Sequence, residues 1–309
     1  MKLITFKYDG RVKLGAIENE MIYDLHSLDK NISDTMRGFL EDGEAQLQLA
    51  NMVINDNSPS ISINDVELLS PVTNPPSVRD AYAFRQHVAT ARKNRGLDMI
   101  PEFDEIPIFY FTNHNAVFGP GDFPVLDRHV EKLDFELECA AVIGKGGRDI
   151  SAANADEHIV GFMIMNDFSA RALQMQEMKL NLGPAKGKDF GSSFGPWLAT
   201  KDELEPYRKS SADGDRYNLK MKAFVNDIQV SEDMLSNMTW TFAQIIERVS
   251  YGVDIFPGDI IGSGTCGTGC FLELNGSKIT DNQWLKPEDT ISLEIEALGT
   301  LTNKIILNG

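Results

Sequence analysis

The chain has 309 residues, of which 46 are acidic and 29 are basic, and its formal net charge is −17. Binding to nucleic-acid phosphates or anionic lipids would need a local basic patch, and the sequence shows none. It also lacks a run of about 18 uncharged apolar residues, so we expect no membrane span and no signal peptide. Three cysteines do not suit a disulfide framework, and the cytoplasm is the expected location.

Short alternating segments open the chain. Residues 1–25 are predicted to form strands joined by hairpin turns, and the apolar spacing over residues 35–53 predicts one or two short helices. A polar stretch and the sequence Leu-Leu-Ser-Pro ending at Pro71 then interrupt the pattern. We therefore expect a small β-rich N-terminal domain over residues 1–68 and a catalytic domain over residues 69–309.

Strand patterns outnumber helix patterns in the larger part. Helices are predicted over residues 79–93 and 240–251. The regular strand–helix alternation of a parallel nucleotide-binding sheet is missing, so a mixed, β-dominated architecture is favoured. Runs rich in Val, Ile, Leu and Phe predict strands at 132–143, 219–225, 291–298 and 302–307.

Three carboxylates alternate along one of these predicted strands. Asp134, Glu136 and Glu138 would share one face of a strand over residues 132–143, because successive side chains point to opposite faces. Neighbouring anions inside an apolar segment repel one another unless a cation or protons neutralise them, which indicates a metal site. The alternative is a solvated acidic face of an antiparallel sheet.

A second polar cluster follows an apolar strand that ends at Met165. Asp167 is a candidate metal ligand, although an Asp just before a helix is also a common N-cap. Arg171 and Gln174 lie three residues apart and would share a helix face, where they would bind a developing anion or a substrate carboxylate. The alternative is a surface Arg beside a Gln.

Asp80 and His87 lie seven residues apart in the predicted helix over residues 79–93. That spacing returns both side chains to one helix face after about two turns. A lone histidine is more often structural than catalytic, and position alone does not select His87 as a base. Cys266 and Cys270 have no CxxC partner, so a zinc site built on them is disfavoured.

Taken together, these segments resemble the fumarylacetoacetate hydrolase family, from about Val78 to the C-terminus. The resemblance implies an α+β, β-dominated fold, a mixed β-sandwich roll with a small N-terminal β-rich domain. It also implies a homodimer. The family motifs occur in order as Leu133–Glu138, Met165–Gln174, Leu182–Pro184 and Gly187–Gly191.

The same resemblance implies roles for individual residues. One divalent metal ion per chain would be held by four carboxylates; Mg²⁺ is expected, with Ca²⁺ or Mn²⁺ as alternatives. A histidine–glutamate dyad would activate water, and three further side chains would stabilise the developing anion. Two more residues would contact the substrate. The implied residues are Asp80, Glu136, Glu138 and Asp167 for the metal, His87 and Glu273 for the dyad, Arg171, Gln174 and Lys188 for the anion, and Tyr82 and Thr265 for the substrate.

The implied reaction is metal-dependent hydrolysis of a C–C bond in a small β-diketo acid, such as fumarylacetoacetate or an acylpyruvate. Another activity at the same site is the first alternative: decarboxylation, isomerisation or hydration of a related keto-enol acid. A non-catalytic metal-binding relative is the second. No nucleic-acid or membrane partner is expected.

Overall fold

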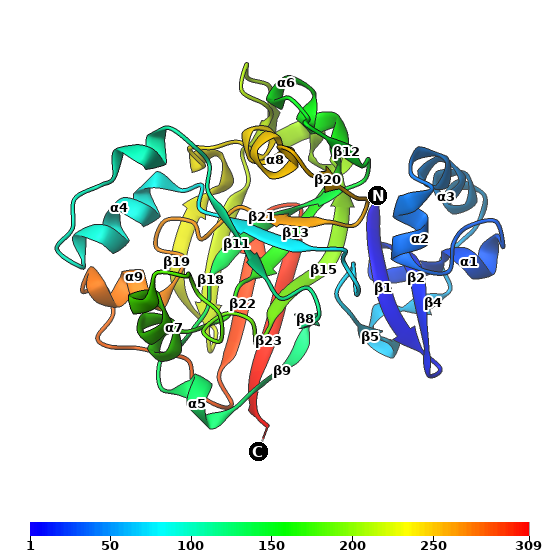
Figure 1. Ribbon diagram of the computed structural model, residues 1–309. Coiled ribbons are helices and arrows are strands. Elements are labelled where there is room, and N and C mark those ends of the chain that lie inside the picture. Colours follow the sequence, from blue (N-terminus) through cyan, green and yellow to red (C-terminus); the bar gives the residue numbers. More distant parts are fainter. Residues whose placement is uncertain (309) are drawn as a thin grey trace.

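The structure is a computed structural model that describes residues 1–308, and strands dominate it (Figure 1). A large sheet contains both antiparallel pairs and the parallel pairs β21–β6 and β15–β8. This sheet carries the candidate site in the half that ends with β6 and β7. In spatial order it runs β4 (Ile61–Ser62), β3 (Met21–Asp24), β2 (Arg11–Glu18), β1 (Lys2–Tyr8), β15 (Ser192–Thr200), β13 (Ile159–Asn166), β11 (Leu137–Ile143), β21 (Ile260–Gly262), β6 (Val78–Ala81) and β7 (Phe109–Thr112), with β5 (Glu67–Leu68) on β1 and β8 (Val117–Phe118) on β15.

A second sheet packs against the middle of the first. Phe162 of β13 and Leu293 of the second sheet belong to one fully buried apolar cluster, so the main core lies between the two sheets. The predicted β-dominated arrangement is confirmed. The second sheet runs β19 (Ile228–Met234), β18 (Lys220–Val225), β22 (Thr290–Ile295), β23 (Gly299–Leu307) and β9 (Gly121–Val125), and two-stranded ladders pair β10 (Leu133–Asp134) with β14 (Ser169–Ala170), β12 (Gly147–Arg148) with β20 (Asp254–Ile255) and β16 (Arg208–Lys209) with β17 (Arg216–Tyr217).

The N-terminal strands and their turns agree with the alternation in the sequence. Asn19 and Glu20 both have positive φ at the tight turn that joins β2 to β3. On its other side β1 pairs with β15, so these strands continue the large sheet and lie to the right of the body in Figure 1. The domain boundary at residue 68 stays a prediction.

The helices are short and lie around the sheets. The prediction of one or two short helices within residues 35–53 is confirmed by α2 (Met36–Glu41) and α3 (Glu44–Asp56). The helix predicted at 240–251 is confirmed as α8, where Thr241 and Gln244 form a capping box and the apolar face is buried. No helix of residues 1–308 is long and apolar enough to cross a membrane. The helices are α1 (Leu25–Leu28), α2 (Met36–Glu41), α3 (Glu44–Asp56), α4 (Arg85–Lys93), α5 (Asp127–Val130), α6 (Ala152–Ala155), α7 (Arg171–Glu177), α8 (Phe242–Ser250) and α9 (Phe271–Gly276).

Two sequence predictions near the site are wrong. Residues 78–81 form strand β6, and the helix begins only at Arg85. Asp80 and His87 therefore do not share a helix face. The strand predicted over residues 132–143 is interrupted at Phe135 and Glu136, because Leu133 and Asp134 pair with β14 whereas β11 pairs with β13 and β21.

Gly161 marks a close approach between β13 and β15. A Cβ atom at this position would lie 2.1 Å from the carbonyl oxygen of Ala199, which is rigid sheet backbone. We predict that Gly161→Ala lowers the free energy of unfolding by about 3 kcal/mol, measured by urea denaturation. The control Gly96→Ala has open space at a φ of +73° and should cost only about 1 kcal/mol. Equal costs would contradict this packing argument.

Candidate active site

Three carboxylates from three different strands converge at one end of the large sheet. Asp80 lies on β6, Glu138 on β11, and Asp167 directly after β13. One oxygen of each lies within 4.8 Å of an oxygen of the other two, and all three side chains are buried. We call Asp80, Glu138 and Asp167 the acidic triad. Gly262 on β21 makes room for it, because a Cβ there would lie 2.3 Å from Oδ1 of Asp80.

The acidic triad has the electrostatics of a cation site. Burial and the nearby charge of Asp167 raise the pKa of Asp80 to about 8. Burial and the charge of Asp80 also raise the pKa of Glu138 well above its usual range. The Oε2 atom of Glu138 is buried without a hydrogen-bond partner in the described chain. Oxygen ligands, mutual repulsion and an unpartnered buried oxygen together fit a hard divalent cation.

These shifts predict how stability depends on pH when metal is withheld. Because the pKa of Asp80 rises from 3.8 to about 8 on folding, Asp80 holds a proton in the folded chain that it lacks in the unfolded chain between these values. In the EDTA-treated protein we therefore expect Asp80 to contribute a loss of stability as pH rises from about 4 to 8, as urea denaturation would measure. Asp80→Asn should reduce this slope, and an unchanged slope would contradict the assignment.

Asp167 is held by three groups from separate segments. Lys188 donates to its Oδ2 at 2.7 Å, Ser192 donates to its Oδ1 at 2.9 Å, and the Tyr110 hydroxyl also donates to Oδ2. Ala170, not Asp167, occupies the N-cap position of α7 and makes no side-chain cap. The capping interpretation of Asp167 is therefore wrong.

Glu136 contacts two buried cations, Arg171 and Lys188, which we call the cationic pair. One of its oxygens accepts from Arg171 at 2.7 Å, and the other accepts from Lys188. Burial would raise the pKa of Glu136, but the charges of Lys188 and Arg171 outweigh burial and hold it below the usual range. Arg171 also donates to Asp134 at 2.8 Å and to Oε1 of Gln174 at 3.0 Å.

Asp134 has a positional role in this network. Its carboxylate accepts from the backbone N–H groups of Phe271 at 2.7 Å and Leu272 at 3.0 Å, at the start of α9. This anchors the helix that carries Glu273. The guanidinium of Arg171 forms an ion pair with the same buried carboxylate and so compensates the cost of burying it.

His87 and Glu273 form a buried pair. Nδ1 of His87 lies 2.6 Å from Oε2 of Glu273, although 186 residues separate them in the chain. The rings of Tyr82 and His87 pack edge to face with their centroids 5.8 Å apart, so Tyr82 forms a wall beside His87. A carboxylate on one ring nitrogen fixes the tautomer and leaves the other nitrogen to act as a base.

The structure thus brings most of the predicted residues into one connected network. Lys188 connects Asp167 of the acidic triad to Glu136, which in turn lies close to His87. Thr265, expected to contact the substrate, donates to Oε1 of Glu138 at 3.3 Å. Tyr110 and Ser192 were not identified from the sequence. From the sequence, Cys270 was considered only together with Cys266, as a zinc site that was disfavoured.

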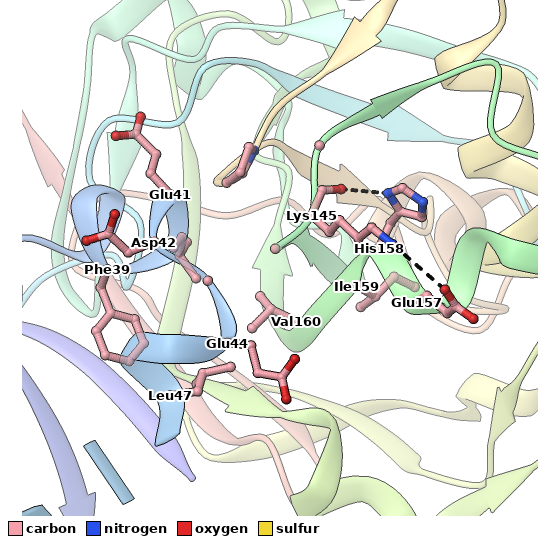
Figure 2. Close-up of a pocket in the computed structure, with 15 residues that line it drawn as sticks. Phe39, Glu41, Asp42, Glu44, Leu47, Lys145, Glu157, His158, Ile159 and Val160 are labelled. Atoms are coloured by element: carbon pink, nitrogen blue, oxygen red, sulfur yellow. Dashed lines mark hydrogen bonds and ion pairs between the residues drawn. The ribbon is translucent and has the colours of Figure 1, made fainter. Parts of the chain in front are cut away.

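A separate cleft of about 430 Å³ lies away from this network (Figure 2). Phe39 and Leu47 of the N-terminal helices form one wall, and Ile159 and Val160 of β13 belong to the other. None of the acidic triad, the cationic pair or the histidine–glutamate pair lines it, so the substrate site is not assigned to it. Its rim carries Glu41, Asp42, Glu44 and Glu157.

Comparison with known proteins decides the family. The family model described as the C-terminal domain of fumarylacetoacetate hydrolase matches residues 77–306. The chain belongs to the fumarylacetoacetate hydrolase family. The family and the β-dominated fold expected from the sequence are both confirmed.

Several relatives of this family member match over nearly its whole length. The human mitochondrial oxaloacetate tautomerase FAHD2A is 31% identical over 286 residues, which cover 92% of this chain and 84% of the relative. The solved fumarylacetoacetate hydrolase of Exiguobacterium antarcticum has a TM-score of 0.73, with 25% identity and complete coverage of both chains. A maleylpyruvate hydrolase from Sphingobium has the same TM-score at 20% identity, which shows the fold alone.

These findings confirm the coarse prediction of an enzyme of this family. The names of the relatives include both tautomerases and hydrolases, so they do not single out C–C bond hydrolysis. The human relative's name also places that protein in mitochondria. The cytoplasmic location and the homodimer stay predictions for this chain.

Proposed function

We propose that this chain interconverts the keto and enol forms of a small 2-oxo dicarboxylic acid of the oxaloacetate type. The observation that carries the proposal is the 31% identity to an oxaloacetate tautomerase over 92% of this chain. Tautomerisation needs a base near the carbon atom next to the carbonyl and a group that stabilises negative charge on the carbonyl oxygen. His87 and Lys188 offer these functions.

We further propose that the acidic triad holds one divalent cation. Its oxygen-only ligand set suits Mg²⁺, with Ca²⁺ or Mn²⁺ as alternatives, and the unpartnered Oε2 of Glu138 supplies a free ligand atom. When bound, the cation would polarise the substrate carbonyl as a Lewis acid. Ligation by Glu136 stays a prediction, because the cluster of carboxylate oxygens consists of Asp80, Glu138 and Asp167.

His87 is the proposed base. Its ring nitrogen remote from Glu273 takes a proton from the carbon next to the carbonyl, and Glu273 stabilises the imidazolium that forms. The ammonium of Lys188 stabilises the negative charge that develops on the carbonyl oxygen. The imidazolium of His87 then gives this proton back, directly or through solvent, to the enolate oxygen, so no water is consumed and no bond between carbons breaks.

Arg171 acts in this proposal by positioning its neighbours. Asp134, Glu136 and Gln174 each accept from one of its three nitrogens. Because the carbonyl oxygen of Gln174 faces Arg171, the amide nitrogen of Gln174 is oriented to donate to a substrate carboxylate. The three residues predicted to stabilise the anion therefore have different roles. Lys188 stabilises the carbonyl oxygen, Gln174 binds a substrate carboxylate, and Arg171 holds Gln174 and Glu136 in position.

Hydrolysis of a C–C bond in fumarylacetoacetate or an acylpyruvate is the second candidate. The observation that favours it is the His87–Glu273 contact of 2.6 Å, because a histidine oriented by a carboxylate also activates water. The solved structure at 25% identity is named as a fumarylacetoacetate hydrolase.

A substrate panel tests the proposal. Freshly dissolved enol-oxaloacetate, fumarylacetoacetate and an acylpyruvate would each be assayed with Mg²⁺, with Mn²⁺ and with EDTA. We expect metal-dependent loss of the enol absorbance of oxaloacetate without release of pyruvate or carbon dioxide. Formation of two smaller acids would support the hydrolase instead, carbon dioxide would indicate a decarboxylase, and turnover of none would favour a non-catalytic protein.

A further inference from the structure

A second group of metal-ligating side chains lies beside the acidic triad. One donor atom from each of His87, Glu136 and Cys270 lies within 4.8 Å of a donor atom from the other two, and all three side chains are buried. This set combines nitrogen, oxygen and sulfur, whereas the acidic triad offers oxygen alone. Imidazole and thiolate ligands suit Zn²⁺, and Mg²⁺ avoids sulfur. The two neighbouring groups therefore suit different metals.

We propose that His87, Cys270 and Glu136 form an inhibitory Zn²⁺ site, distinct from the acidic triad. Zinc bound there occupies the nitrogen of His87 that serves as the base in the proposed reaction, so the enzyme stops while the ion at the acidic triad stays in place. The inhibitory role rests on that proposed function, and the active chain is then sensitive to free zinc.

The surroundings of His87 support zinc binding independently of the ligand distances. A histidine that ligates a metal usually directs its second ring nitrogen to a carboxylate, which fixes the ring and raises its basicity. Glu273 is placed this way, 2.6 Å from Nδ1 of His87. Cys270 is the residue immediately before α9, which also carries Glu273. Asp134 accepts from two backbone N–H groups at the start of that helix, which fixes the Cys270 thiol and the Glu273 carboxylate relative to each other.

The local charge also tolerates a cation. Arg171 and Lys188 contact the carboxyl groups of Asp134 and Glu136, and the carboxyl group of Glu273 adds a third acidic side chain beside His87. Each oxygen of Glu136 has two acceptor positions, so one that already accepts a hydrogen bond can still ligate a metal.

Cobalt binding tests the site without any need for turnover. Co²⁺ bound to a thiolate gives a sulfur-to-metal charge-transfer absorption in the near ultraviolet, which oxygen and nitrogen ligands alone do not give. We expect this absorption when the Mg²⁺-saturated protein is titrated with Co²⁺. It should disappear in Cys270→Ala and Cys270→Ser and persist in the control Cys266→Ala, which changes a buried cysteine outside the cluster. Cobalt absorption that persists in both Cys270 variants would overturn the proposal.

Inhibition gives the second readout. Zinc should inhibit the Mg²⁺-saturated enzyme, and Cys270→Ala should raise the zinc concentration for half-inhibition at least about 10-fold, measured against the zinc-free rate of the same variant. Relief of inhibition by excess Mg²⁺ would place zinc at the acidic triad and overturn the proposal. Cobalt binding is read by absorption and needs no turnover. A chain that binds cobalt through Cys270 but does not tautomerise oxaloacetate would therefore contradict the tautomerase proposal and not the zinc site.

Discussion

Glu138→Gln is expected to abolish divalent-metal binding and to lower turnover about 1000-fold. Gln keeps the size of the side chain and one carbonyl oxygen, but it removes a negative charge from the centre of the acidic triad. A Lewis-acid metal supplies several kcal/mol of transition-state stabilisation, and about 4 kcal/mol corresponds to a factor of 1000. Equilibrium dialysis with Mn²⁺ and a steady-state assay would measure the two losses.

The same substitution should raise stability when metal is absent. Glu138 is buried beside Asp80, and the pKa of both groups is raised, so at neutral pH the metal-free chain must take up protons there when it folds; Gln is neutral already and removes the part of this cost that Glu138 contributes. Thermal unfolding in EDTA should occur at a higher temperature than in the unchanged protein. Glu232→Gln, on the exposed part of β19, is the matched control and should change neither property. Unchanged Mn²⁺ affinity in Glu138→Gln would contradict the proposed metal site.

His87→Ala is expected to lower kcat by about 100- to 10,000-fold, the range that a positioned general base contributes. Metal affinity at the acidic triad should stay unchanged, because His87 is not one of its ligands. Steady-state kinetics together with Mn²⁺ dialysis would separate the two properties. A kcat close to that of the unchanged protein would remove His87 from the reaction.

Glu273→Gln distinguishes a positioning role from a purely structural one. Gln still accepts a hydrogen bond from Nδ1 of His87, but it does not stabilise the imidazolium by charge. We therefore expect a smaller loss of kcat than in His87→Ala, together with a lower apparent pKa of the base in the pH profile of kcat. A lower kcat with an unshifted profile would contradict this role.

The sequence predicted most elements of the site, and its errors have local physical causes. Alternating carboxylates and a strand that ends at Asn-Asp identified Glu138 and Asp167. Asp80 was assigned to a helix because residues 79–93 contain no strong helix breaker. Its strand β6 has only four residues and forms through pairing with β21 and β7, distant segments that local propensity does not register.

The residues that sequence reasoning missed make contacts over long sequence separations. Tyr110 lies 57 residues before Asp167, and a Phe-Tyr-Phe segment is equally compatible with an ordinary strand. Ser192 donates to Asp167 from the first residue of β15, with no motif of its own. Asp134 shares the spacing of the other carboxylates, yet the break at Phe135 and Glu136 turns it toward α9. Such placements depend on tertiary pairing and not on local pattern.

Proton transfer to carbon is the most direct test of the tautomerase proposal. Enol-oxaloacetate would be converted in D₂O with Mg²⁺, the keto product reduced at once to malate, and deuterium at C3 located by NMR. The account predicts one deuterium on a single face of C3 with the unchanged protein, and an even distribution over both faces with His87→Ala or Glu138→Gln. An even distribution with the unchanged protein, or cleavage of the carbon chain, would contradict it.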